Sequence, residues 1–126
     1  MTGQGVPDTE AEFPMRYMML IHHDEAALAK APPSLWGDYA AFNEAIAKAG
    51  ISFQPGNRLQ PSSAASTVRV AGDKTAVLDG PYADTKEQLA GYFMIDVPEL
   101  DQAIAWAARC PIARYGSIEI RPLAPA

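Results

Sequence analysis

Cysteine is nearly absent from this chain, because Cys110 is the only one in 126 residues. A single cysteine excludes an internal disulfide and any metal site that needs several cysteines. Long apolar runs are absent too, since a run such as Tyr17–Ile21 is far shorter than the ~20 residues of a membrane-spanning helix. The N-terminus has neither the basic start nor the apolar centre of a signal peptide, so we expect a cytoplasmic protein with no membrane partner.

Basic residues are scarce as well, because 10 Lys and Arg stand against 15 Asp and Glu, a net charge of −5. This balance argues against direct nucleic-acid binding. The acids near the N-terminus have no basic neighbour, and we expect residues 1–13 to form a flexible acidic leader. The rest of the chain has the length and composition of one globular domain. We therefore predict a single domain over residues 14–123 and a short tail over 124–126.

The pattern of apolar and turn-forming residues predicts an alternation of strands and helices. In chain order, the predicted elements are a strand Met15–His22, a helix from its N-cap Ser34 to Gly50, a strand Ile51–Gln60, a hairpin with strands Thr67–Val70 and Thr75–Leu78, a helical turn Thr85–Leu89, a strand Tyr92–Val97, a helix opened by Pro98 and stopped at Pro111, and a strand Ser117–Arg121. This order predicts an α+β ferredoxin-like plait, an antiparallel sheet with two helices on one face.

Two of the predicted strands are apolar on both sides. In the first strand, Tyr17, Met19 and Ile21 point to one side and Met18 and Leu20 to the other. In the strand from Tyr92, the residues on one side are Phe93, Ile95 and Val97, and those on the other are Tyr92 and Met94. Two helices cover only one face of a plait, and monomers rarely expose a large apolar patch on the other. We therefore predict a homodimer formed sheet to sheet, as in a dimeric α+β barrel.

Polar residues follow the first predicted strand, at the kind of sheet end that often hosts a site. His22 and Asp24 are the candidate proton-transfer residues there. Adjacent residues of a strand point in opposite directions, so His22 and His23 cannot readily share a ligand, and we expect only one to face a pocket. No other histidine and no glycine-rich phosphate loop occur, so we expect no metal and no cofactor. The alternative is a polar strand end with a solvated turn.

The densest polar segment is Asp79–Glu87. Its candidate ligand-binding residues are Asp79, Gly80, Tyr82 and Lys86, which would form the wall or lid of a pocket, with Lys86 available for an anion. The alternative is structural. In that interpretation Asp79 caps the Gly80-Pro81 turn, and Asp84 caps the next turn with Glu87 in capping-box spacing.

Arginines suit the recognition of carboxylates and phosphates because their donors form a rigid fork. We therefore add Arg58 and Arg114 to the candidate ligand-binding residues, with Tyr92 as part of a wall. Arg114 forms a further charged cluster with Glu119 and Arg121, which Arg58 could join through space. The alternative for this cluster is an Arg–Glu ladder along an exposed strand face.

The segment Asp79-Gly80-Pro81-Tyr82-Ala83-Asp84-Thr85-Lys86-Glu87 closely resembles the DGPFAETKE signature of the YCII-related, or DGPF-domain, proteins. The similarity begins near Met15 and continues through Gln88–Phe93 and through much of Ala107–Pro122. The resemblance implies a dimeric α+β barrel built on the plait, in agreement with the apolar pattern of the strands.

The resemblance also bears on activity. Relatives in the wider superfamily include small enzymes with a histidine–aspartate pair, and the resemblance puts Tyr39, or a neighbour, and Cys110 at those two positions. The pair is therefore expected to be missing, and Cys110 to be a buried small hydrophobe.

Two functions follow as hypotheses. The first is a homodimer that binds, or transforms by proton transfer, a small polar or anionic organic compound. The alternative is a non-catalytic regulatory module in a sigma-factor circuit, beside which DGPF-type proteins are often found.

Overall fold

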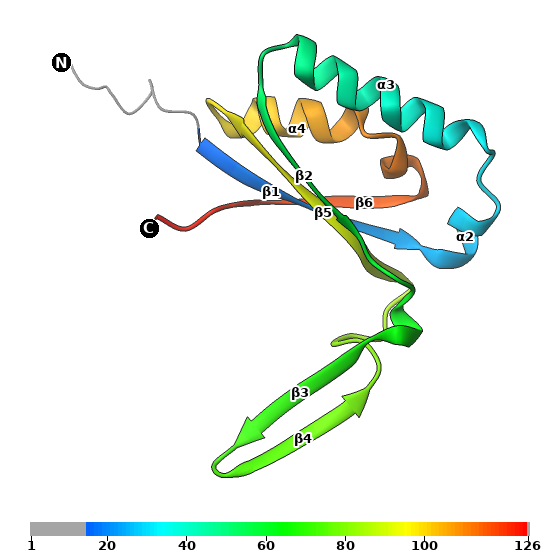
Figure 1. Cartoon of the computed structure of the whole chain (residues 1–126), viewed down its shortest axis with the longest axis vertical. Coiled ribbons are helices and arrows are strands. Elements are labelled where there is room, and N and C mark those ends of the chain that lie inside the picture. Colours follow the sequence, from blue (N-terminus) through cyan, green and yellow to red (C-terminus); the bar gives the residue numbers. More distant parts are fainter. Residues whose placement is uncertain (1–14, 126) are drawn as a thin grey trace.

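A computed structural model describes residues 15–125 (Figure 1). The predicted acidic leader, residues 1–13, lies outside the described residues, as does the last residue of the predicted tail. The elements are β1 (Met15–Asp24), α2 (Glu25–Ala29), α3 (Ser34–Lys48), β2 (Ser52–Arg58), the 3-10 helix η1 (Ser62–Ala64), β3 (Ser66–Ala71), β4 (Lys74–Asp79), β5 (Glu87–Val97), α4 (Leu100–Arg109), the 3-10 helix η2 (Pro111–Tyr115) and β6 (Gly116–Pro122). Within these residues, no helix has the length and apolar character needed to cross a bilayer.

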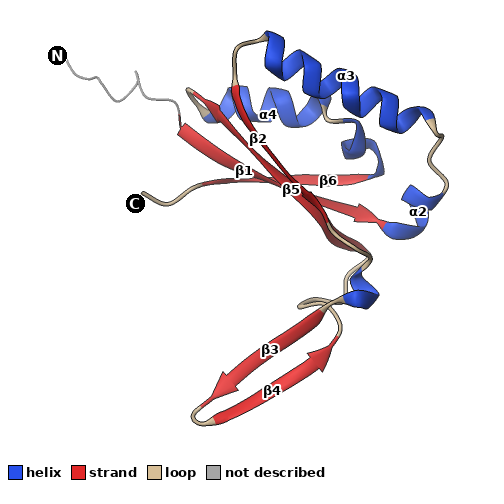
Figure 2. Cartoon of the chain, in the orientation of Figure 1, coloured by secondary structure: helices blue, strands red, loops and turns tan. Residues whose placement is uncertain are grey.

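Four strands form an antiparallel sheet in the order β2-β5-β1-β6, and α3 and α4 cover one of its faces (Figure 2). This is the ferredoxin-like arrangement, and it confirms the predicted α+β plait. We call the face under α3 and α4 the covered face. The opposite face carries Met18, Leu20, His22 and Met94, and we call it the open face.

The covered face holds the core, because every second residue of the two central strands points toward the helices. In β1 and β5 these residues are almost completely buried, whereas the residues between them are only half-buried. Met19, Ile46 and Ile95 are fully buried, which stabilises the fold by about 1.5–3 kcal/mol for each side chain. The ring of Phe42 in α3 meets Phe93 of β5 edge-on, with the ring centres 6.0 Å apart. Tyr17, Met19 and Ile21 therefore share one side of β1, and Phe93, Ile95 and Val97 one side of β5, as predicted.

Three local predictions are wrong at the ends of elements. Ser34 is the first residue of α3 and not its N-cap, because Pro33 already has helical backbone angles. Pro98 does not open α4, since Glu99 is extended and acts as the N-cap through its carbonyl group. The predicted helical turn Thr85–Leu89 is replaced by the start of β5. There, pairing with an extended β1 satisfies the backbone groups of Glu87, Gln88 and Leu89.

The predicted hairpin is present as β3 and β4, which form a separate two-stranded sheet. Val68 lies opposite Val77, and the turn at the tip uses Gly72 with a φ of 63°, a value that favours glycine. The base of the hairpin is closed by a hydrogen bond from the Gly80 N–H to the Ala65 carbonyl, 2.7 Å long. Figure 1 shows that the hairpin extends away from the sheet on the side opposite α3 and α4.

Candidate functional site

The last residues of β1 place two adjacent histidines on opposite faces of the sheet. His23 continues the parity of Ile21 and lies on the covered face, where it is 8% exposed. His22 lies on the open face and is about a third exposed, with a side-chain value of 29%. Each histidine lines a different pocket. The expectation that only one of the two would face a pocket is therefore wrong.

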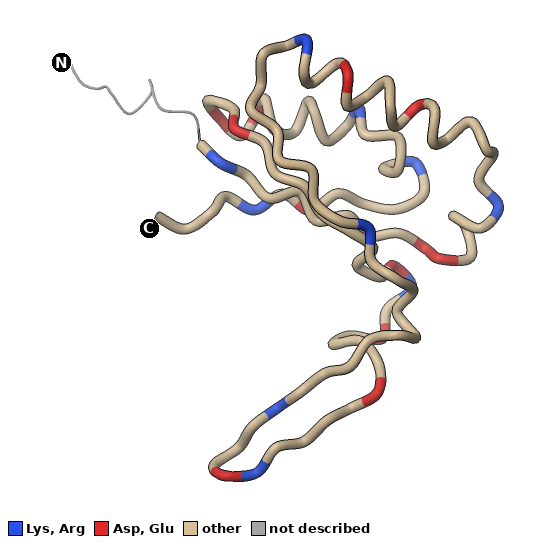
Figure 3. Tube along the Cα trace, in the orientation of Figure 1, with Lys and Arg blue, Asp and Glu red and all other residues tan. Residues whose placement is uncertain are grey.

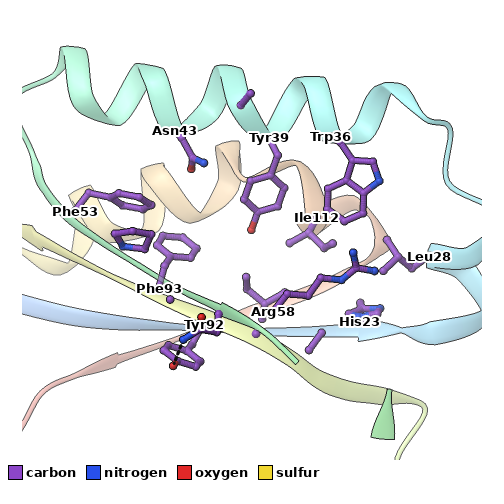
Figure 4. A pocket seen from close by; sticks show the side chains of 17 residues that line it. His23, Leu28, Trp36, Tyr39, Asn43, Phe53, Arg58, Tyr92, Phe93 and Ile112 are labelled. Carbon is purple, nitrogen blue, oxygen red and sulfur yellow. Dashed lines mark hydrogen bonds between the residues drawn. The ribbon is translucent and has the colours of Figure 1, made fainter. Parts of the chain in front are cut away.

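The first pocket lies between α3 and the sheet, and we call it the helix-side pocket (Figure 4). Its volume is about 380 Å³. In Figure 4 the rings of Trp36 and Tyr39 point from α3 toward the sheet, while Phe53 and Phe93 rise from β2 and β5. The walls of this pocket are therefore mostly aromatic and apolar, as in sites that bind small organic molecules.

Two glycines, Gly56 of β2 and Gly91 of β5, lie in the sheet beside this pocket. The pairing of β2 with β5 is irregular between Pro55 and Arg58. A Cβ atom on Gly56 would overlap the carbonyl oxygen of Tyr92, and one on Gly91 would lie 2.9 Å from the carbonyl oxygen of Asn57. Glycine is therefore required at both positions by the close approach of the two backbones. Both glycines also line the helix-side pocket, so the close approach of β2 and β5 forms part of its floor.

Arg58 is the principal charged residue of the helix-side pocket. Its guanidinium carbon lies 4.7 Å from the centre of the Trp36 ring, which holds the side chain across the pocket by a cation–π contact. Among residues 15–125, no carboxylate lies within ion-pair distance of this guanidinium. Its fork of N–H donors is therefore available to a ligand. The suggestion that Arg58 joins Glu119 and Arg121 is wrong, since those two lie on the open face.

His23 is the second polar group of this pocket. Its Nδ1 atom is enclosed and has no hydrogen-bond partner in the described part of the chain. Buried polar atoms are nearly always paired, so an orphan of this kind calls for an explanation. Because Nδ1 is sealed off, Nε2 is the ring nitrogen that a molecule in the pocket can reach.

Tyr39 and Cys110, the two positions that the resemblance singled out, are in contact. The Cys110 thiol donates a hydrogen bond to the Tyr39 hydroxyl at 3.5 Å. Burial is the main cause that raises the pKa of both groups, and it raises that of Tyr39 well above its ordinary value. The shared hydrogen bond raises the pKa of Tyr39 further and partly offsets the effect of burial on the pKa of Cys110. Both groups are therefore neutral near pH 7. Cys110 is 1% exposed, so the expected buried small hydrophobe is confirmed.

The second pocket lies beside the root of the hairpin, and we call it the loop-side pocket. It has a volume of about 480 Å³ and is lined by His22 and by residues of the 59–65 and 81–89 segments. His22 Nε2–H donates to Glu119 Oε1 at 3.0 Å, and Arg121 holds the other carboxylate oxygen at 2.8 Å. These hydrogen bonds, that of Arg121 first and that of His22 second, lower the pKa of Glu119. The Arg–Glu ladder is confirmed for Glu119 and Arg121.

Among the described residues, Asp24 and His22 form no hydrogen bond or ion pair with each other. Its carboxylate caps α2 by accepting hydrogen bonds from the N–H groups of Ala26 and Ala27 at 3.0 and 3.3 Å. The ammonium group of Lys86 lies 3.8 Å from the same carboxylate. Asp24 and Lys86 are thus neighbours, and the turn after β1 is a short helix that the sequence patterns did not predict.

The other predicted site residues are spread over the molecule. Asp79 and Gly80 form the base of the hairpin, where Thr67 donates to the Gly80 carbonyl. Tyr82 lines the loop-side pocket, and the residue is 83% exposed. Tyr92 lines the helix-side pocket, and its hydroxyl accepts a hydrogen bond from Asn57 at 3.0 Å. Arg114 is exposed in η2 and borders neither pocket.

The predicted capping box in the Asp79–Glu87 segment is also wrong, because no helix follows it. The segment is held instead by the Gln88 side chain, which donates to the carbonyls of Ala83 and Thr85, each at 2.9 Å. Glu87 accepts a hydrogen bond from the Ser117 hydroxyl at 2.7 Å. Within the described residues, no group of three or more His, Cys, Asp or Glu side chains has the arrangement of a metal site.

Sequence reasoning did not assign a site role to His23 or Trp36. A signal for His23 was present, because it shares strand parity with Tyr17, Met19 and Ile21, the core residues of β1. Trp36 was part of the apolar stripe of α3, and only the stacked Arg58 marks it as part of a pocket.

A model of the YCII-related domain matches residues 15–126 of this chain. An uncharacterized protein of Rhizobium meliloti (strain 1021) is 37% identical over 116 residues, a match that covers 87% of this chain and 93% of the relative. The chain therefore belongs to the YCII-related family.

Proposed function

We propose that this YCII-related protein is a homodimer that binds a small organic carboxylate in the helix-side pocket. The observation that carries the proposal is the Arg58 guanidinium, which is stacked on Trp36 and has no carboxylate partner among the described residues. An arginine held in place in this way binds a carboxylate through two parallel N–H donors at little entropic cost.

The shape of the pocket suggests the rest of the ligand. A volume of about 380 Å³ corresponds to on the order of ten non-hydrogen atoms, at the ~30 Å³ that a water molecule occupies in the liquid. The aromatic walls formed by Trp36, Tyr39 and Phe53 favour a flat apolar body over a sugar or a phosphate ester. An aromatic or short branched carboxylate fits both requirements.

His23 supports binding more than proton transfer in this pocket. A histidine that takes a proton at Nε2 carries its own proton on Nδ1, and in a catalytic triad an acceptor holds that proton and fixes the tautomer. The Nδ1 atom of His23 is enclosed without an acceptor, so we assign the proton of the neutral ring to Nε2. His23 then donates a hydrogen bond from Nε2–H to the ligand, beside Arg58.

Binding of benzoate and salicylate, followed by isothermal titration calorimetry, tests the proposal. Benzamide serves as the neutral control of nearly the same shape. We expect R58M to weaken benzoate binding roughly 10–100-fold, the loss of one charge-assisted contact, and to leave benzamide binding unchanged. R109M is the matched variant, because Arg109 also stacks on a tryptophan, Trp106, at 4.3 Å, but lies outside the pocket. Equal binding by wild type and R58M would contradict the proposal.

A second candidate function is proton transfer at His22. The pairing of His22 with Glu119 at 3.0 Å, next to the loop-side pocket, is the arrangement that orients a histidine for acid–base chemistry. Deuterium uptake by oxaloacetate and other 2-oxo acids in heavy water, followed by NMR, is the test. We expect H22N and E119Q to reduce the exchange at least tenfold and H23N to leave it unchanged. Exchange at the rate of the buffer alone would contradict this candidate.

The homodimer is supported by the open face. Met18, Leu20 and Met94 are half-buried there. Met18 lies opposite Met94, and Leu20 opposite Tyr92, at the centre of the sheet. The regulatory alternative linked to a sigma-factor circuit stays a prediction from the resemblance.

A further inference from the structure

The β3–β4 hairpin has an apolar face that nothing in the described chain covers. Val68, Val70 and Val77 are 60%, 61% and 63% exposed. Val68 lies directly opposite Val77, and Val70 is two residues further along the same strand, so all three valines share one face. Arg69 and Ala76, the pair between them, point to the other face.

The hairpin has little support from the rest of the molecule. The hydrogen bonds at its base join its own two ends, because Gly80 N–H donates to the Ala65 carbonyl and the Thr67 hydroxyl donates to the Gly80 carbonyl. Every residue of β4 is exposed. A lone two-stranded hairpin is marginally stable in water at best, so a second surface is needed to hold this one in place.

The hairpin and the open face lie on the same side of the molecule. In Figure 1 the hairpin extends from one end of the sheet away from α3 and α4. A layer packed on the open face at the usual ~10 Å would therefore also touch the hairpin. One partner can cover both surfaces.

The charges of the open face do not oppose such packing. Arg16 is paired with Asp96 at 2.9 Å, and Arg121 with Glu119 at 2.8 Å. These pairs lie within one chain, so covering them leaves no unpaired charge among them. On the hairpin, the charged residues alternate with the valines or stand at its two ends, as Figure 3 shows along the chain trace.

The available area favours contact through both surfaces. Strand lengths and spacings give the open face about 550 Å² and one face of the hairpin about 200 Å² in plan. A stable interface buries about 800 Å² on each partner. In projection, the hairpin adds about a third to the area of the open face that a second copy can cover.

We propose that the hairpin is an arm by which each copy of this chain holds a second copy, with the face of Val68, Val70 and Val77 packed on the partner. This inference rests on the homodimer of the proposed function and deepens it. A second copy is the fitting occupant, because one two-fold axis buries both arms and both open faces at once. The loop-side pocket borders the root of the arm at Ala64 and Ala65, so the assembly also encloses the surroundings of His22.

Sedimentation velocity of the full chain between about 1 and 100 µM tests the arm, a span that brackets ordinary dimer affinities. We expect wild type to be a dimer and V68D/V77D to raise the dimer dissociation constant at least ~tenfold, because it places charge in an apolar contact. A76D is the matched control, since Ala76 is on the other face of the hairpin. It should dimerise like wild type.

A second variant guards against local unfolding in V68D/V77D. Ala65 and Gly80 are already hydrogen-bonded to each other, so two glycines can replace residues 66–79 without stretching the sheet. We expect this armless chain to keep its circular dichroism and its benzoate affinity and to lose dimer affinity at least ~tenfold. If both variants dimerise like wild type, the proposal of an arm is wrong but that of a homodimer is not. A monomeric wild type, alone or with another protein as its partner, overturns both.

Discussion

The two faces of the four-stranded sheet are built from neighbouring residues but have different surroundings. Met19 and His23 lie on the covered face, whereas Met18 and His22, each one residue earlier, lie on the open face. The covered face has a packed core and a pocket with an arginine that lacks a carboxylate partner among the described residues. The open face has half-buried apolar side chains and ion pairs. A shift of one residue along β1 therefore separates the side chains of the helix-side pocket from those of the open face.

The largest contrast between the faces is expected in stability. Ile95 is fully buried on the covered face, and Met94 is half-buried on the open face. We expect I95A to lower the free energy of unfolding by about 2–5 kcal/mol, because it leaves a cavity in a packed core. M94A should lower it by about 1 kcal/mol or less in dilute protein. Urea denaturation measures both values, and equal losses would mean that the faces are not distinct.

A second contrast concerns glycines on the covered side. A side chain on Gly56 would overlap the Tyr92 carbonyl, whereas Gly37 of α3 has open space around its Cβ position. We expect G56A to lower the free energy of unfolding by about 1–3 kcal/mol and to weaken benzoate binding by at least ~tenfold. G37A should raise stability by up to ~1 kcal/mol, the helix propensity of alanine over glycine. Benzoate binding that is unaffected by G56A would show that the bulge does not shape the pocket.

The smallest contrast is expected in the pH dependence of the open face. The pKa of Glu119 is lowered in the folded protein, chiefly by Arg121 and then by His22. Its ionisation therefore stabilises the fold above the unfolded pKa of about 4.3. That contribution is lost as the pH falls through the lower folded pKa. Thermal unfolding of wild type and E119Q should differ slightly at pH 7 and converge below about pH 4. A difference that persists in acid would contradict the ion pairing.

The fold could be predicted because its signals are redundant. The apolar runs of β1 and β5, the stripe of α3 and the valines of the hairpin each specify an element without help from the others. Element ends were less predictable. Thr85–Leu89 has the residues of a capped helical turn, but pairing with β1 decides its conformation, and that pairing depends on how far β1 extends.

The candidate site was harder to predict because it depends on distance through space. Arg58 was predicted as a ligand-binding residue and lines the helix-side pocket, but the Trp36 ring on which it stacks comes from another element. His22 and Asp24 were grouped because they are close in the sequence, yet Asp24 caps α2 and His22 pairs with Glu119, 97 residues away. The parity of β1 could have identified His23 as the histidine of the covered face.

Residue-resolved oxidation of the methionines by peroxide, over a dilution series, most directly tests whether the open face is buried by a second copy. We expect Met18 and Met94 to become more protected as the protein concentration rises, because dimerisation covers them. Met19, fully buried in the core, should stay protected at every concentration and serves as the internal reference. Oxidation of Met18 and Met94 at one constant rate throughout the series, with Met19 still protected, would contradict the division of the sheet into a binding face and a pairing face.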